Sequence, residues 1–251
     1  MLSDHLLTIS TSVVNFNFFG GIVQGTIKHA RDLASYIDHT LLKPDATEKE
    51  IRRLCEEARH FGFKAVCVNP VFVKQTRKWL RRSPVLSVSV VGFPLGTSLT
   101  RTKALEAELA VHDGAAEIDM VIRFDLVKER RWKPFEKDIS EVVKASGPAP
   151  VKVIIETGLL EESEIVRVCK CAESAGAAFI KTSTGFLGRG ATVEDVQLIR
   201  KTCSPTMKIK ASGGIKSFAQ ALALIEAGAD RLGTSSGVLI VNGQEAADGS
   251  Y

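Results

Sequence analysis

The sequence predicts an α/β fold of the (β/α)8 TIM-barrel class, in which a parallel eight-stranded barrel follows an N-terminal extension. Three observations favour this fold. The chain has 251 residues, close to the usual length of such a barrel. A six-residue sequence repeat that begins with glycine, called the phrase below, occurs at residues 62–67, 114–119, 176–181 and 228–233. Apolar runs of strand length alternate with helical patterns, which gives about eight strands, each followed by a helix.

The barrel is expected to occupy residues 35–251, including a C-terminal tail, and residues 1–34 form the predicted extension. The first 25 residues have no basic side chain before their apolar part, so we do not expect a secretory signal there. We assign them no role.

Four strands are predicted within the repeated phrase and four between its copies. The first, third, fifth and seventh strands are expected at residues 35–40, 85–93, 151–156 and 207–211. The second, fourth, sixth and eighth are expected at the ends of the phrase, within residues 62–67, 114–119, 176–181 and 228–233. Each copy begins with glycine just past a helical pattern, where the backbone often needs a positive φ angle.

Helix starts lie between these strands. Thr47 with Glu50, and Ser217 with Gln220, have the spacing of capping boxes, and Thr192 begins a similar pattern. A doubly wound open sheet is the alternative fold. It is less favoured because no glycine fingerprint follows the first strand.

Composition and charge are those of an ordinary soluble domain, with 45% hydrophobic and 25% charged residues. The net charge is +4 without a long run of Lys or Arg, which favours a small anionic substrate over nucleic acid. No apolar stretch is long enough to cross a membrane. The five cysteines have no metal-ligand spacing and indicate free thiols in a reducing compartment, which we take to be the cytoplasm.

The repeat also predicts which side chains point into the barrel, because strand residues alternate faces and alternate strands share inward layers. The next-to-last residue of each copy is apolar and is expected to point outward beneath the helices: Val66, Ile118, Ile180 and Leu232. The last residue is then expected to point inward: Cys67, Asp119, Lys181 and Gly233. Asp119 and Lys181 should share a layer near the C-terminal mouth, and Lys210 on the next strand should reach it.

Two lysines and an acid at the mouth of a barrel favour Schiff-base chemistry. Two ammonium groups held close together repel each other, so one loses its proton more easily, and a neutral lysine amine attacks carbonyls. Lys181 is the predicted nucleophile, Lys210 supplies the second charge, and Asp119 acts as general acid or base, directly or through water. A structural ion pair between Lys181 and Asp119 is the alternative, because an unpaired lysine is costly inside a barrel.

Four further residues are candidates for lining the substrate pocket. Asp38 and Thr40 can hydrogen-bond a substrate hydroxyl, or can serve as turn and capping residues. Lys152 can extend the charge network or lie at the surface. Cys67 can line the pocket or fill the interior as a small apolar side chain. His39 has no partners at ligand spacing, and no metal site is predicted.

Turns rich in glycine and serine follow the last three predicted strands and predict a phosphate site. Barrels often bind phosphate with the loops after strands seven and eight and with the N-terminus of a short helix, for which residues 236–241 are the candidate. Glycines let the backbone approach the anion, and N–H groups and hydroxyls bind it. The three turns span residues 183–185, 212–214 and 233–237.

From about residue 35 to the C-terminus the chain resembles the deoxyribose-phosphate aldolase family. The resemblance rests on seven segments in order, namely DHTLLKP (38–44), VCVNP (66–70), VGFPLG (91–96), EIDMV (117–121), KVIIET (152–157), KTSTGF (181–186) and KASGGI (210–215).

This resemblance implies a class I aldolase that reversibly cleaves 2-deoxy-D-ribose 5-phosphate to acetaldehyde and D-glyceraldehyde 3-phosphate, without a metal or organic cofactor. Lys181 matches the Schiff-base lysine of the family, Lys210 its second lysine and Asp119 the acid of its proton relay. The four pocket residues named above match family positions too. The family's phosphate site is matched by Gly185, Gly213, Gly214, Ser235 and Ser236. Tyr251, the last residue, is a candidate for the tail tyrosine that assists proton transfer in many members. A homodimer or homotetramer is expected.

One departure concerns the phosphate site. Some members have a phosphate-binding lysine where this chain has Phe186, and Lys216 or Arg189 is the candidate to replace it. Two other functions stay open. One is an isomerase or a different Schiff-base aldolase on a phosphate-binding barrel. The other is a sugar-phosphate binding protein without catalysis, which would bind without turnover.

Overall fold

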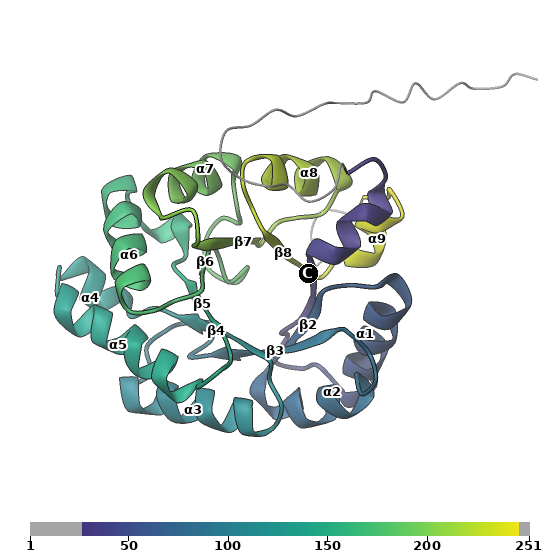
Figure 1. Ribbon diagram of the computed structural model, residues 1–251, viewed down its shortest axis with the longest axis horizontal. Helices are drawn as coiled ribbons and strands as arrows, with labels where there is room; N and C mark the ends of the chain where they lie inside the picture. Colours follow the sequence, from purple (N-terminus) through teal and green to yellow (C-terminus); the bar gives the residue numbers. More distant parts are fainter. Residues whose placement is uncertain (1–26, 246–251) are drawn as a thin grey trace, which may run out of the picture.

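The computed structural model describes residues 27–245, which form a closed barrel of eight parallel strands surrounded by helices (Figure 1). Each strand pairs with the next, and the first pairs with the last, with Asp38 opposite Gly233. The strands are Ile37–Leu41 (β1), Ala65–Val68 (β2), Leu86–Val91 (β3), Glu117–Val121 (β4), Val151–Ile154 (β5), Phe179–Lys181 (β6), Lys208–Ser212 (β7) and Arg231–Thr234 (β8). The predicted barrel is confirmed and the open-sheet alternative is wrong.

Most of the predicted N-terminal extension, residues 1–26, lies outside the described residues, as do residues 246–251 with Tyr251. The extension and its boundary stay predictions.

Helices connect successive strands on the outside of the barrel (Figure 1). The α-helices are Glu48–Phe61 (α1), Val73–Trp79 (α2), Thr100–His112 (α3), Phe124–Lys128 (α4), Trp132–Ala145 (α5), Glu162–Ser174 (α6), Val193–Thr202 (α7), Phe218–Glu226 (α8) and Gly237–Val241 (α9). The 3-10 helices are Ala30–Tyr36 (η1), Pro70–Phe72 (η2) and Thr157–Leu159 (η3).

The predicted helix starts are confirmed. The side chains of Thr47 and Ser217 accept N–H groups in the first turns of α1 and α8 within complete capping boxes, and Thr192 caps α7 by accepting the N–H of Asp195. The four glycines of the repeat have φ angles between 72° and 112°, in the left-handed region that other residues avoid. They are Gly62, Gly114, Gly176 and Gly228.

The four strands between the copies of the repeat all differ from their predicted bounds. The third spans residues 86–91 and the seventh residues 208–212, shifts of one or two residues at their ends. The first and fifth differ for an identifiable physical reason. The first begins at Ile37, because Ser35 and Tyr36 end the 3-10 helix η1. The fifth ends at Ile154, because Glu156 takes a positive φ angle of 51° and the chain leaves the barrel there. The extended conformation of a strand is incompatible with that angle.

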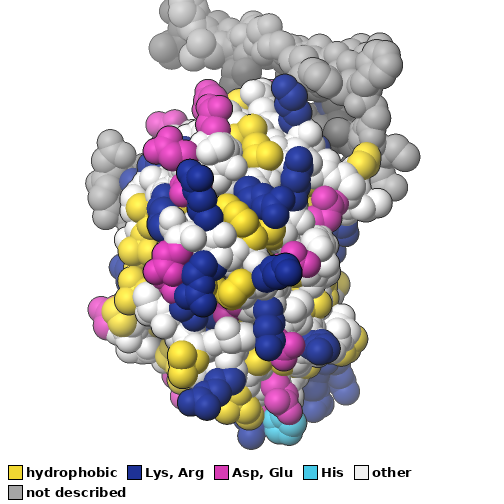
Figure 2. Space-filling model, turned by 90° about the vertical axis from the view of Figure 1, so that its left-hand side faces the viewer, with side chains coloured by type: hydrophobic (Ala, Val, Ile, Leu, Met, Phe, Trp, Pro, Cys, Tyr) yellow, Lys and Arg dark blue, Asp and Glu magenta, His cyan; other side chains and the backbone are white. Residues whose placement is uncertain are grey.

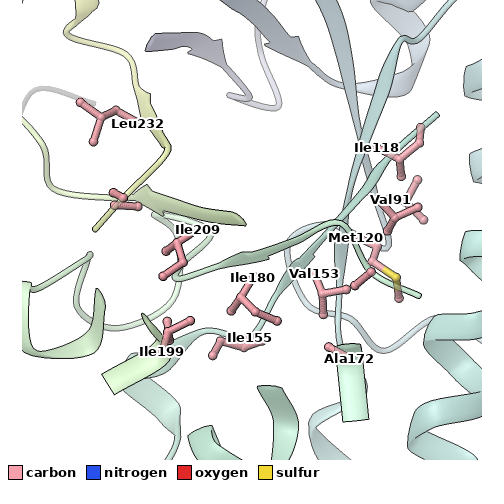
Figure 3. Close-up of a cluster of buried hydrophobic side chains, with 14 of the residues drawn as sticks. Val91, Ile118, Met120, Val153, Ile155, Ala172, Ile180, Ile199, Ile209 and Leu232 are labelled. Carbon is pink, nitrogen blue, oxygen red and sulfur yellow. The ribbon is translucent and has the colours of Figure 1, made fainter. Parts of the chain in front are cut away.

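Apolar side chains form two separate cores, one outside the barrel and one inside. The outer core contains the four residues predicted to point outward, Val66, Ile118, Ile180 and Leu232, and Figure 3 shows the last three packed in it. The inner core consists of Leu42, Ala65, Cys67, Val88 and Val90. Its members come from β2, β3 and the residue after β1, so it occupies one side of the barrel interior. The other side is left to polar residues.

The surface carries charges of both signs. Figure 2 shows the face that includes α4, α5 and α6, on which Lys and Arg side chains alternate with acidic and hydrophobic ones. Among the described helices, none has the length and apolar character needed to cross a bilayer.

A buried ion pair fixes α3 against α5. The Nζ atom of Lys103 lies 2.5 Å from Oδ2 of Asp138 and donates at 3.1 Å to the carbonyl of Val121 in β4. The hydroxyl of Thr100 donates to the other carboxylate oxygen at 2.8 Å. Both charged side chains are fully buried. Removing either partner would therefore leave an uncompensated charge in a medium of low dielectric constant.

We predict that Asp138→Ala lowers the free energy of unfolding by about 3–5 kcal/mol, because the ammonium of Lys103 stays buried without its carboxylate. Urea denaturation followed by circular dichroism measures the change. Asp113→Ala is the matched control, since that carboxylate is partly exposed. A change at Asp138 as small as that at Asp113 would contradict the prediction.

Candidate active site

Seven charged side chains fill the polar side of the barrel interior. They are the acids Asp38, Glu117 and Asp119 and the bases Lys152, Lys181, Lys210 and Arg231, and all of them are buried. They project from β1, β4, β5, β6, β7 and β8. Burying this many charges requires that each has partners of opposite sign.

Asp119 lies at the centre of this network and accepts hydrogen bonds from three lysines. Its Oδ1 atom accepts from Nζ of Lys152 at 2.8 Å. Its Oδ2 atom accepts from Nζ of Lys181 and from Nζ of Lys210, each at 2.8 Å. Burial raises the pKa of Asp119, but the charges of the three lysines outweigh burial and hold it well below its usual range. Asp119 is therefore an ionised carboxylate near neutral pH.

Lys210 is bound by two carboxylates, Asp119 and Asp38, the latter at 2.5 Å. Burial lowers the pKa of Lys210, but the two carboxylates outweigh burial and raise it above its ordinary value. Burial also raises the pKa of Asp38, whereas Lys210 and Arg231 lower it, and the net shift is downward. Lys210 is thus a fixed cation and Asp38 a fixed anion.

Gly233 makes room for Lys210. A Cβ atom added at Gly233 would lie 3.0 Å from Cε of Lys210 and 2.9 Å from Cβ of Ser212. Gly233, the fourth inward residue of the repeat, therefore leaves a space in the barrel interior that the side chain of Lys210 fills.

Glu117 and Arg231 close the network toward the N-terminal end of the strands, and sequence reasoning missed both. Glu117 lies 2.6 Å from Nζ of Lys152 and accepts from Nη2 of Arg231 at 2.6 Å. Arg231 also donates to Oδ1 of Asp38 at 3.3 Å. Both residues stand two positions before an inward residue of the repeat, so strand alternation gives the signal that would have found them.

Lys181 ends β6 at the C-terminal mouth, and Asp119 is its one carboxylate partner among residues 27–245. Asp119 shares the same oxygen with Lys210. With every member ionised the network carries three negative and four positive charges, and loss of one proton would make it neutral. Lys181 has the fewest ion-pair partners of the four cations among the described residues.

The predicted pocket residues lie in the same interior. Asp38 and Lys152 are fully buried members of the network, so Lys152 is no surface lysine and Asp38 caps no helix. Cys67 belongs to the inner apolar core, where burial raises the pKa of its thiol. The hydroxyl of Thr40 donates to the carbonyl of Asp38 at 2.8 Å, on the same face of β1.

The glycine turns after β6 and β7 touch each other through their backbones. Gly185, Gly213 and Gly214 have φ angles of 84°, 84° and 74°. A Cβ atom on Gly213 would lie 3.3 Å from Cα of Gly185 and 3.1 Å from Cα of Gly190, a contact that sequence reasoning missed. None of the backbone hydrogen bonds between described residues uses the N–H of Gly185, Gly213 or Gly214. Three backbone donors thus stay available to an anion.

After β8, Ser236 immediately precedes the short helix α9, whose predicted position is confirmed. Its N–H donates to the hydroxyl of Thr234, which fixes the turn containing Ser235. Phe186 packs edge to face on Phe93 with 5.2 Å between ring centroids.

Arg189 forms an ion pair with Asp195, so its guanidinium is already engaged by a carboxylate. Within the described part of the chain, no three His, Cys, Asp or Glu side chains are grouped as metal ligands.

We predict that Gly233→Ala displaces Lys210 and lowers kcat at least about tenfold, because a methyl group at 3.0 Å forces the lysine off its carboxylates. Steady-state kinetics and the melting temperature of the purified variant measure the effect. Gly243→Ala serves as control for kcat, since nothing lies within 4 Å of a Cβ there and its φ angle of 70° strains only the local backbone, so a lower melting temperature with unchanged kcat is expected of it. Equal activity of the two variants would refute the steric account.

The sequence matches the family described as DeoC/LacD family aldolase over residues 33–242. It is 52% identical to the deoxyribose-phosphate aldolase of Thermococcus gammatolerans over 221 residues, which cover 86% of this chain and 98% of that protein. It is 50% identical to the one of Staphylococcus carnosus over 220 residues, 88% of this chain and 100% of that protein.

Solved structures of the same kind superpose on the barrel. A putative deoxyribose-phosphate aldolase from Coccidioides immitis has a TM-score of 0.83 at 40% identity, covering 85% of this chain and 86% of that one. The deoxyribose phosphate aldolase from Aeropyrum pernix, described as a unique tetrameric structure, has a TM-score of 0.80 at 36% identity, covering 85% and 91%.

Proposed function

The chain belongs to the DeoC/LacD family of aldolases, and from that premise we propose that it reversibly cleaves 2-deoxy-D-ribose 5-phosphate to acetaldehyde and D-glyceraldehyde 3-phosphate through a Schiff base on Lys181. The observation that carries the proposal is the hydrogen bond of Lys181 to an ionised Asp119 that Lys210 shares, at the C-terminal mouth of the barrel. Active sites of such barrels lie at that mouth.

The reaction begins when the neutral amine of Lys181 adds to the aldehyde carbon, C1, of the open-chain sugar. The resulting carbinolamine takes up a proton from an acid in the site and loses water, which gives a protonated imine. Removal of the proton from the C3 hydroxyl then breaks the C2–C3 bond, and its electron pair moves toward the iminium nitrogen. D-glyceraldehyde 3-phosphate leaves with the new carbonyl. Protonation of the remaining enamine at C2 and hydrolysis of the imine release acetaldehyde and restore the amine.

Asp119 serves this sequence as an ionised acceptor. Because its pKa is far below neutrality, it holds a proton only briefly, so it orients water or a hydroxyl for transfer. Lys210 supplies the fixed charge beside Lys181, which favours the neutral amine over a second ammonium. Tyr251 is proposed as a further proton-transfer residue, and it lies outside the described residues.

The phosphate of the substrate is proposed to bind the turns after β6, β7 and β8. The N–H groups of Gly185, Gly213 and Gly214, which make no backbone hydrogen bond within residues 27–245, support this site together with Ser235 and Ser236 beside the N-terminus of α9. Thr40, at the rim of the same interior and partly exposed, is the candidate to bind a sugar hydroxyl. Asp38, Lys152 and Cys67 are proposed to lie beneath the substrate. Asp38 and Lys152 belong to the charged network there, and Cys67 belongs to the inner core.

The proposed reaction needs no metal or organic cofactor, since the iminium group on Lys181 accepts the electron pair of the broken bond and becomes an enamine. We further propose a cytoplasmic enzyme of sugar-phosphate breakdown. It acts as a homodimer or homotetramer, and the tetramer described for the Aeropyrum pernix relative supports association.

Borohydride reduction in the presence of acetaldehyde should add a stable ethyl group to Lys181, detected by peptide mass spectrometry. Lys181→Leu should lose the adduct and all turnover while it keeps its fold, because the network then has three charges of each sign. Lys208→Leu is the control, since Lys208 is exposed at the start of β7. An adduct elsewhere, or turnover by Lys181→Leu, would rule out this mechanism.

A panel of aldehyde acceptors and sugar phosphates distinguishes this reaction from those of other Schiff-base aldolases. The expected result is the highest kcat/KM with 2-deoxy-D-ribose 5-phosphate. A higher value with another sugar phosphate would reassign the substrate and leave the Schiff base intact.

Lys210→Met is predicted to lower kcat at pH 7 at least about tenfold and to move the rise of activity to higher pH. Without Lys210 the ionised network has three charges of each sign, so the positive excess beside Lys181 on which the proposal rests is gone. A pH–rate profile between pH 6 and about 10 measures the shift. An unshifted profile with reduced kcat would show that Lys210 does not act through Lys181.

A further inference from the structure

The loop between β6 and α7, residues 182–192, follows the proposed nucleophile and contains Gly185 of the proposed phosphate site. Two consecutive residues after β5, Glu156 and Thr157, hold this loop. Neither is needed by the mechanism given above.

Glu156 is a fully buried carboxyl group on an unfavourable backbone. Its φ and ψ angles are 51° and 70°, in the left-handed region that residues other than glycine rarely adopt. Of the described residues, only Arg82 and Arg130 share this property, and both lie exposed. A buried residue keeps such a conformation only where its surroundings fix it.

The side chain of Glu156 fixes the first half of the loop. Its Oε2 atom accepts the N–H of Thr184 at 2.9 Å and the hydroxyl of Thr184 at 2.5 Å. The hydroxyl oxygen of Thr184 in turn accepts the N–H of Phe186 at 3.0 Å. These bonds hold the residues on both sides of Gly185, whose own N–H takes part in no backbone hydrogen bond of the described chain.

Thr157 fixes the start and the end of the same loop. Its N–H donates to the carbonyl of Thr182 at 2.9 Å, and its hydroxyl donates to Oδ2 of Asp195 at 2.7 Å. Asp195 accepts from Nη2 of Arg189 at 2.9 Å, near the end of the loop. With both ends held, the bonds from Glu156 to Thr184 decide the position of the Gly185 turn.

Glu156 has one further property that packing alone does not require. Its Oε1 atom is buried and has no hydrogen-bond partner among residues 27–245. Burial raises the pKa of Glu156, although the hydrogen bonds from Thr184 and the charge of Lys181 oppose this shift. A buried carboxyl group with one unpaired oxygen lowers the stability of the fold. The hydrogen bonds that its other oxygen accepts from the loop offset this loss of stability.

Resting on the aldolase function proposed above, we propose that Glu156 is a positioning residue that orients the Gly185 turn for the phosphate group of the substrate, without touching the reacting carbons. The phosphate-bearing end of the substrate depends on it, whereas Schiff-base formation at Lys181 does not.

The test compares Glu156→Ala and Glu156→Gln on 2-deoxyribose 5-phosphate and on 2-deoxyribose. Glu156→Ala should raise KM for the phosphorylated sugar at least about tenfold and change kcat/KM for 2-deoxyribose less than about threefold, because only the phosphate contacts are lost. Glu156→Gln should restore KM to within about threefold of the unaltered enzyme, since its amide oxygen can accept both bonds from Thr184. Equal losses on the two sugars would overturn the proposal.

A second pair of variants tests the other partner and covers the case in which Glu156→Ala does not fold. Thr184→Val removes the hydroxyl that bonds Glu156, whereas Thr184→Ser keeps it. KM for the phosphorylated sugar should rise in the valine variant alone, and equal KM values in the two would refute the positioning role. Failure of the unaltered enzyme to form a reduced adduct with acetaldehyde would instead refute the aldolase function.

Discussion

The ion pairs around Asp119 are the interaction on which the rest of the barrel interior depends. One carboxylate accepts from Lys152, Lys181 and Lys210, and without it three ammonium groups would face each other in a medium of low dielectric constant. The lysines in turn hold the carboxylate ionised. Because the network has one more base than acid, it is one proton away from neutrality, and the function proposed for Lys181 rests on this excess.

The division of the barrel interior lets this network exist. Apolar residues of β2 and β3 fill one side, so the charged side chains of the remaining strands lie close enough to pair. Gly233 leaves room for the network because it has no side chain, whereas a methyl group there would contact Lys210. In the loops after β6 and β7, Gly185, Gly190 and Gly213 also have no side chain, and their backbones pack directly against one another.

Much of the fold was predictable from local patterns. The glycine-led phrase predicted four strands, and the outward apolar and inward polar positions followed from strand alternation, which the two cores confirm. The same alternation predicted that Asp119 and Lys181 lie together. Glu117 and Arg231 were not predicted, although each lies two residues before an inward residue of the repeat and on the same face of its strand.

Other features had no local signal. The 3-10 helix at Ser35 and Tyr36 replaces an expected strand start because Leu33 is buried in the outer core, a contact with distant segments. Lys152 could be read as buried or exposed, since a lysine beside an apolar strand fits both environments until its partners are known. Arg189, a candidate for phosphate, is taken by Asp195 in a contact that spacing alone did not suggest.

By itself, then, the sequence determined the class of barrel, the identity of its inward layer and the positions of the helix ends, because these depend on periodicity, caps and glycine conformation within a few residues. Tertiary structure decided which charges share Asp119, how many bases the network contains and which residue holds the Gly185 turn. Those properties depend on distances between strands far apart in the chain. Since the strength of an ion pair varies with separation and burial, they exist only once the barrel has closed.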